Sequence, residues 1–109
     1  MALHKVSRNE VAEREAYERV ETAVYRAIDT LNEMLAPTQR LARSRNTVLV
    51  ESDGSVDSMA LVNLIVFIED ELAQALGEQL DLTGADAFAP EDLASVGTVI
   101  GALCAKLDR

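Results

Sequence analysis

The residues best suited to chemistry lie in the middle of the chain, where Asp57 and Ser58 precede a long apolar stretch. Ser58 offers a hydroxyl, and the small, acidic, turn-prone residues 51–56 before it indicate a loop. From Met59 to Leu76 the apolar spacing is that of a helix. The pattern therefore predicts a serine at the start of a helix with its oxygen in solvent. An Asp-Ser pair also commonly caps a helix, so the pair alone does not identify a reactive site.

The single cysteine and the single histidine of the chain limit the kinds of site it can form. Cys104 is the single cysteine, which excludes an intramolecular disulfide and a cysteine-based metal cluster. We interpret it as a small buried apolar residue. The single histidine, His4, lies at the extreme N-terminus, and Ser58 lacks the Gly-x-Ser-x-Gly context of a hydrolase nucleophile. A serine hydrolase is therefore a poor hypothesis, and we expect a protein that is not an enzyme.

The length and the net charge of the chain restrict the class of protein and its partners further. The chain has 109 residues, which suits one small domain, and its formal net charge is −9. This charge would repel nucleic acid, and basic patches on other proteins are the natural counterpart, although the charge alone could also serve solubility. We find no apolar stretch long enough to cross a bilayer and no signal-peptide core at the N-terminus. We therefore expect a cytoplasmic protein without a membrane role.

The first predicted helix begins at a capping box, Ser7 to Glu10, and ends near Leu35, before Pro37. Its beginning is rich in interleaved Glu and Arg, so residues 1–19 are predicted to be a charged helical N-terminal extension and residues 20–109 the folded domain. The extension would either fray in solvent or dock a partner, and we favour the first. The predicted core-facing stripe of this helix is Val20, Val24, Ile28, Leu31 and Leu35.

A long connection over residues 37–57 follows. We expect residues 47–50 to tuck their side chains into the core as a loop, while a short strand there and a helical turn over residues 38–45 remain open alternatives. The second helix is predicted over residues 58–76, with Gly77 as its stop. Its apolar residues cover most of its circumference, so we expect it to be the central helix of the bundle. The predicted stripe is Leu61, Ile65, Ile68, Leu72 and Leu76, widened by Val62, Val66 and Phe67.

After an irregular stretch, Pro90 to Leu93 suits the first turn of a short helix. Ser95 is the predicted N-cap of a last helix over residues 96–107, in which Gly97 and Gly101 would allow close approach to a neighbour. The fold class is therefore all-α. We expect a small four-helix bundle of three main helices and one short helix, with a long first loop.

Over residues 20–107 the chain resembles acyl carrier proteins. The resemblance is most specific at Asp57-Ser58-Met59 and at the acidic triplet Glu69-Asp70-Glu71 followed by Leu72. Ser95-Val96 is similar to the Thr-Val that opens the last helix in that family, and the order of elements fits. The chain departs from the family pattern at Ser55, where a glycine is usual, and at Ala60 and Asn63, where acidic residues are frequent.

The resemblance implies an acyl-carrier-like fold and a 4'-phosphopantetheine arm, moved from coenzyme A onto Ser58 by a phosphopantetheinyl transferase. Asp57, the adjacent motif residue, would help to orient the transferase or its metal ion. Acyl or aminoacyl groups would travel on the arm as thioesters, in fatty-acid-like or secondary-metabolite biosynthesis, on a monomeric carrier.

The same resemblance implies which residues meet other proteins. Met59, Glu69, Asp70 and Glu71 would contact loading and condensing enzymes that carry basic patches. Without the resemblance, the acidic triplet would be read as a solvated helix surface. The alternative function is an unmodified helical protein–protein interaction module with the same fold.

Overall fold

A computed structural model of the chain describes residues 8–50, 58–84 and 87–107. These residues form three α-helices and two short 3₁₀ helices, and they contain no strand beyond one isolated bridge. In chain order the elements are α1 (Arg8–Asn32), η1 (Pro37–Gln39), α2 (Ser58–Leu76), η2 (Pro90–Leu93) and α3 (Val96–Leu107). The all-α prediction is confirmed. The short fourth helix is only a 3₁₀ turn.

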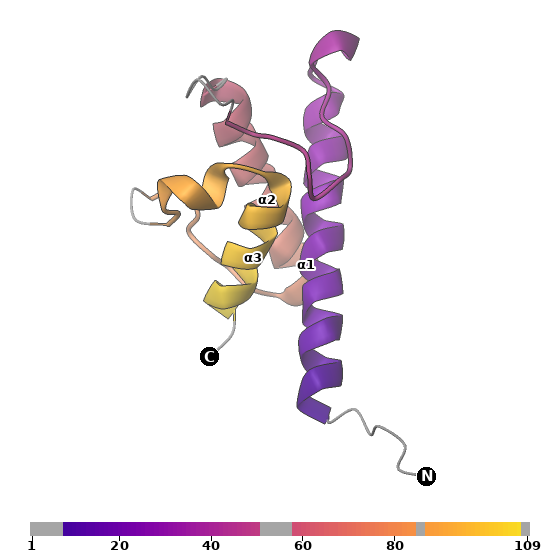
Figure 1. The fold of residues 1–109 in the computed structure, drawn as a ribbon, viewed down its shortest axis with the longest axis vertical. Coiled ribbons are helices and arrows are strands. Elements are labelled where there is room, and N and C mark those ends of the chain that lie inside the picture. The colour runs from indigo at the N-terminus through magenta and orange to yellow at the C-terminus, as the bar shows by residue number, and fades with distance from the viewer. Residues whose placement is uncertain (1–7, 51–57, 85–86, 108–109) are drawn as a thin grey trace.

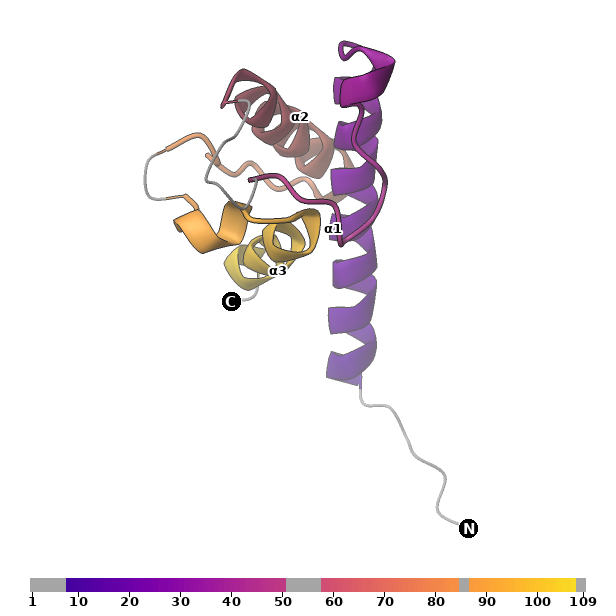
Figure 2. The same cartoon turned by 45° about the horizontal axis from the view of Figure 1, so that its top comes forward.

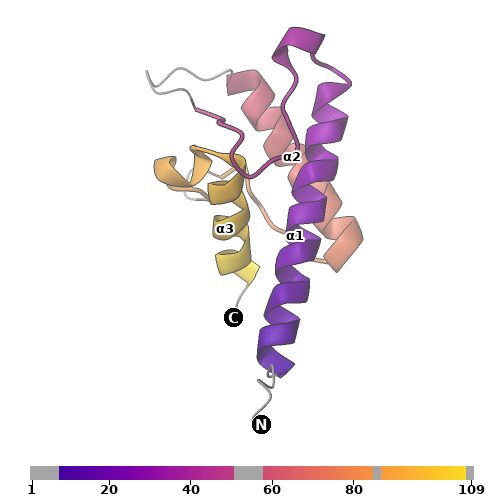
Figure 3. The same ribbon diagram turned by 45° about the vertical axis from the view of Figure 1, so that its right-hand side comes forward.

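The helix α1 is the element against which both α2 and α3 pack (Figure 1). Its 25 residues give a rod of about 38 Å, roughly twice the length of α3. Both α2 and α3 lie against it in all three views (Figures 2 and 3). The prediction that the second helix would be central is wrong, because α2 buries one face only and leaves Val62 and Val66 exposed.

The core is aliphatic and draws on all three helices. From α1 it takes the predicted stripe Val20, Val24, Ile28 and Leu31, whereas Leu35 is only partly buried. On α2 the buried residues are Leu64, Ile65, Ile68 and Leu72. Leu64 is missing from the predicted stripe, whose two ends, Leu61 and Leu76, are only partly buried because they lie near the ends of the helix. On α3 the core residues are Val96, Val99, Ile100 and Leu103.

The helix ends follow local signals in the sequence. The helix α1 ends at Asn32, three residues before the predicted end, because residues 33–35 already form a turn before η1. Gly77 has a φ of +67°, the left-handed conformation that stops α2. The Ser95 hydroxyl accepts a hydrogen bond from the backbone N–H of Thr98 at 3.2 Å, so the predicted N-cap of α3 is confirmed.

We call residues 41–50 the strap, because this segment crosses from α1 to the start of α3. The backbone N–H groups of Val96 and Gly97 donate to the carbonyls of Thr47 and Arg45, at 2.9 and 2.8 Å. The helix α3 thus obtains partners for N–H groups that have none within a helix. Leu49 packs against the core as predicted, but Val48, which forms the isolated bridge with Ser95, is 51% exposed.

Of the two glycines predicted to permit close approach in α3, only Gly97 does so. A Cβ at Gly97 would lie 3.0 Å from the carbonyl oxygen of Arg45, so the strap rests directly on this residue. A Cβ at Gly101 would meet no atom within 4 Å. The prediction for Gly101 is therefore wrong, since that residue is exposed.

The N-terminal part of α1 runs past the bundle (Figure 1). Residues 11–19 are exposed except for the half-buried Tyr17, and Val20 is the first fully buried residue. The predicted cap from Ser7 to Glu10, together with His4, lies outside the residues that can be described in full. No helix within the described residues has the length and apolarity needed to cross a membrane.

Candidate functional site

Ser58 is the first residue of α2, and its side chain is exposed. The first turn of α2 contains no acidic residue, so no carboxylate there offsets the positive end of the helix dipole. An anionic group on the Ser58 oxygen would therefore lie at a favourable position. Asp57, predicted as the neighbouring motif residue, falls in residues 51–57, outside the described part of the chain.

Next to Ser58, α2 presents an exposed apolar stripe. Met59, Val62 and Val66 are 75%, 52% and 43% exposed. Their spacing of three and four residues places them on one face of the helix, directly beyond Ser58. Sequence reasoning placed Val62 and Val66 in the buried face, and this was wrong. Met59, in contrast, was predicted to meet partners, and its exposure is compatible with that role.

The acidic triplet does not form one surface. Glu69 accepts a partly buried hydrogen bond at 2.8 Å from the backbone N–H of Leu82, a residue whose side chain belongs to the core. Asp70 is exposed and accepts a hydrogen bond from Gln74 at 3.1 Å. Glu71 is half-buried against α1. Successive helical residues are rotated by about 100°, so the three side chains point in different directions, and the first begins about 17 Å along the axis from Ser58.

Glu71 lies in a charged groove between α1 and α2 that sequence reasoning did not identify. This groove has a volume of about 340 Å³ and contains both carboxylates and guanidinium groups. Its lining residues include Glu15, Glu18, Arg19, Arg26 and Glu71. Glu71 therefore shares this groove with two arginines and two glutamates of α1.

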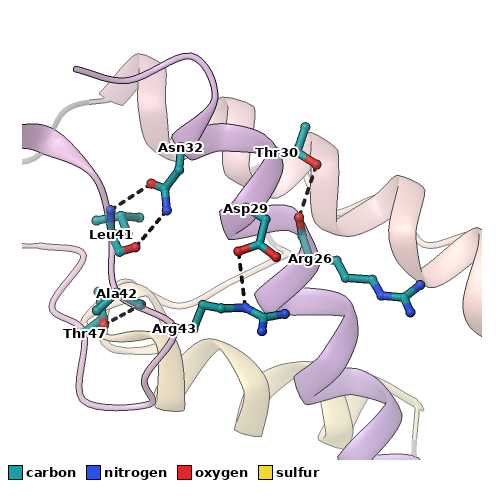
Figure 4. A network of polar contacts seen from close by, with 8 residues as sticks. All are labelled: Arg26, Asp29, Thr30, Asn32, Leu41, Ala42, Arg43 and Thr47. Carbon is teal, nitrogen blue, oxygen red and sulfur yellow. Dashed lines mark hydrogen bonds and ion pairs between the residues drawn. The ribbon is translucent and has the colours of Figure 1, made fainter. Parts of the chain in front are cut away.

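The strap is fastened to α1 by polar side chains (Figure 4). The side-chain amide of Asn32 both donates to and accepts from the backbone of Leu41, each time at 2.8 Å. Arg43 forms an ion pair with Asp29 at 3.2 Å, and its guanidinium carbon lies 5.4 Å from the centre of the Tyr25 ring. Arg26 extends from α1 in another direction and takes no part in this fastening (Figure 4).

Arg45 repeats the arrangement two residues further along the strap. It pairs with Glu21 at 3.4 Å, its guanidinium carbon lies 5.8 Å from the centre of the Tyr17 ring, and it donates a hydrogen bond to the Tyr17 hydroxyl at 3.1 Å. The hydrogen bond to Tyr17 raises the pKa of Arg45, which stays protonated in any case. Four residues of α1 follow one another at intervals of four and could have indicated a stripe: Tyr17, Glu21, Tyr25 and Asp29. Nothing in the sequence of the strap indicated that Arg43 and Arg45 would contact this stripe.

A second groove, of about 440 Å³, lies between the N-terminal half of α1 and the end of α3. Tyr17 and Cys104 both line it, and most of its other lining residues are apolar: Ala12, Ala16, Val20, Ala105 and Leu107, with Glu13 as the charged member. Burial raises the pKa of the Cys104 thiol. Cys104 is half-buried and packs at the edge of the core, close to the interpretation given from sequence.

No family model, no curated protein and no solved structure matches this chain. Among the residues that can be described, no group of three or more His, Cys, Asp or Glu side chains is placed to hold a metal ion.

Proposed function

We propose that this protein is a freestanding acyl carrier protein, with an acyl-carrier-like fold, whose 4'-phosphopantetheine arm is attached to Ser58. The observation that carries the proposal is the exposed hydroxyl at the first position of a 19-residue helix, between Asp57 and Met59. The resemblance of the sequence around it to carrier proteins gives this serine its role. A buried oxygen, or one in the middle of a helix, could not serve as a tether.

The attachment reaction needs little from the carrier itself. The Ser58 oxygen attacks the phosphorus of coenzyme A that bears the pantetheine, a new O–P bond forms, adenosine 3',5'-bisphosphate leaves, and the serine proton passes to a base of the transferase. The positive end of α2 would then stabilise the phosphodiester. The arm supplies the thiol for thioester chemistry, so the carrier needs no catalytic cysteine. Asp57 would help to orient the transferase or its metal ion.

Partner enzymes would approach the end of α2 that bears Ser58. Met59 would enter an apolar contact, and Val62 and Val66 extend that contact along the same face. The charges of Glu69, Asp70 and Glu71 would steer enzymes with basic patches, since charges at the rim of an interface act mainly on encounter and partner choice. Acyl or aminoacyl intermediates of a cytoplasmic pathway, fatty-acid-like or secondary-metabolite, would be the cargo of this monomeric carrier.

The test is the intact mass of the protein after incubation with coenzyme A and a promiscuous phosphopantetheinyl transferase. We expect the gain of one phosphopantetheine on the wild type and on Ser95→Ala, which removes the hydroxyl at the start of α3, but none on Ser58→Ala. Failure of the wild type with several transferases would overturn the proposal, and so would a gain on Ser58→Ala.

The second candidate is an unmodified helical interaction module. It is favoured by the exposed stripe of Met59, Val62 and Val66, which is a contact surface whether or not Ser58 carries an arm. Under this hypothesis Ser58→Ala keeps full partner binding, whereas Val62→Asp reduces it.

A further inference from the structure

Two of the fastenings of the strap on α1, those made by arginine side chains, are copies of each other. Arg43 holds Tyr25 and Asp29, and Arg45 holds Tyr17 and Glu21. In each copy the tyrosine and the acid are four residues apart on α1, and the second copy lies eight residues before the first. The four α1 residues therefore form one continuous stripe, along which the strap runs antiparallel to the helix.

The strap is held differently on its two sides. On the α3 side it is held by backbone hydrogen bonds and by the close packing of Arg45 on Gly97. On the α1 side Arg43 and Arg45 are held only through side chains that are 51% and 60% exposed. Exposed ion pairs and cation–π contacts are individually weak and, in the case of ion pairs, sensitive to salt. Local opening should therefore begin at Arg43 and Arg45, where the strap faces α1.

Tyr17 connects this fastening to the groove between α1 and α3. Arg45 donates a hydrogen bond to the Tyr17 hydroxyl and lies over the Tyr17 ring. The Tyr17 side chain also lines the groove that contains Cys104. Tyr17 is half-buried and packs against the core, so apolar contacts and the hydrogen bond from Arg45 together hold its ring in place. The single cysteine of the chain is thereby a natural reporter of the state of the groove.

We propose that the strap is a conformational latch for this groove: Arg45 holds the Tyr17 ring as a wall of the groove, and release of Arg45 lets the ring turn away and opens the groove to small neutral molecules. Arg45 acts through Tyr17 and is a positioning residue. The latch does not depend on modification of Ser58, so it can be tested on the unmodified protein.

The experiment measures the rate at which iodoacetamide alkylates Cys104 in the full-length protein, followed by intact mass. Iodoacetamide is neutral, so salt does not change its attraction to the acidic chain. The test variant is Arg45→Met, which keeps most of the length of the side chain and removes its charge. The matched control is Arg40→Met, because Arg40 comes just before the strap and donates to the Asn32 carbonyl at 3.2 Å.

We expect Arg45→Met to react roughly three- to tenfold faster than the wild type at low salt, as the loss of one cation–π contact and one exposed ion pair predicts. Removal of the Arg45 charge can only raise the pKa of the Cys104 thiol, which would slow alkylation. A faster reaction of Arg45→Met would therefore report easier access of iodoacetamide to Cys104. Added salt should speed the wild type and leave Arg45→Met nearly unchanged, and Arg40→Met should behave as the wild type.

Equal rates and equal salt dependence in Arg45→Met, Arg40→Met and the wild type would overturn the latch. If Arg45→Met loses its helical circular dichroism, the test variant becomes Tyr17→Phe. This variant keeps the ring and removes only the hydroxyl that Arg45 holds. Faster alkylation of Tyr17→Phe supports the latch, and a wild-type rate overturns it.

Discussion

The Glu69 carboxylate accepts the backbone N–H of Leu82, the residue that inserts the segment after α2 into the core. Glu69 was predicted to meet partner enzymes, and the structure gives it a contact within the fold as well. Asp70, its neighbour, accepts a hydrogen bond from the exposed side-chain amide of Gln74, one turn further along the helix. Two adjacent acidic residues therefore differ in what their removal should do.

Glu69→Ala should destabilise the fold by about 1–2 kcal/mol, because a partly buried N–H loses its charged acceptor. For a domain of this size, this loss lowers Tm by roughly 5–10 °C. Asp70→Ala, the matched control, should change the stability by less than about 0.5 kcal/mol. Thermal unfolding followed by circular dichroism measures both. Equal melting temperatures for the two variants would show that the bond to Leu82 contributes nothing, and Glu69 would then be free to act as a surface charge.

The same residues show what a sequence can reveal at this scale. Spacing identified Ser58 at a helix start and Ser95 as a cap, because caps depend on residues close in the chain. It did not reveal that Glu69 binds Leu82 or that Arg43 and Arg45 bind tyrosines of α1. Those partners are 13 residues apart or more, and no local preference links them.

At the scale of elements, α2 shows why a helix is easier to predict than its orientation. Its bounds agree with the prediction, Ser58 to Leu76. Valine and isoleucine are equally apolar, however, so the hydropathy of α2 could not tell its buried face from its exposed face. The structure identifies the buried face, because Ile65 and Ile68 are buried while Val62 and Val66 are exposed.

This assignment predicts opposite results for two substitutions three residues apart. Ile65 is 8% exposed, so Ile65→Asp buries an unpaired carboxylate and should unfold a domain whose total stability is about 5–15 kcal/mol. Val62 is 52% exposed and lies near the positive end of α2, so Val62→Asp should cost less than about 0.5 kcal/mol. Urea unfolding distinguishes them. A stable Ile65→Asp, or an unfolded Val62→Asp, would mean that α2 is rotated about its axis and buries a different face.

For the whole molecule, the sequence predicted the order of the helices and the bounds of α2, but neither the end of α1 nor the arrangement of the other helices around it. The apolar stripe from Val20 to Leu31 is clear from spacing alone, but the spacing does not reveal how many helices pack against it. Here the stripe packs against both α2 and α3, while the part of α1 before Val20 extends beyond the bundle (Figure 1). The length of α1 relative to α3 produces this overhang and, with it, the groove beside Cys104.

The overhang predicts where the chain can be shortened. Among the residues whose burial the structure describes, deletion of residues 1–16 removes only the exposed residues 11–16 and leaves every fully buried residue in place, so its cost should be below about 1 kcal/mol. Deletion of residues 1–24 also removes Val20, Ala23 and Val24, each at most 1% exposed, and should unfold the protein. Circular dichroism and thermal unfolding of the two truncated proteins measure this difference. The shorter deletion should also speed alkylation of Cys104, because Ala12 and Ala16 line its groove. If deletion of residues 1–16 already abolished folding, the charged extension would be part of the folding unit, and the boundary expected between residues 19 and 20 would not exist.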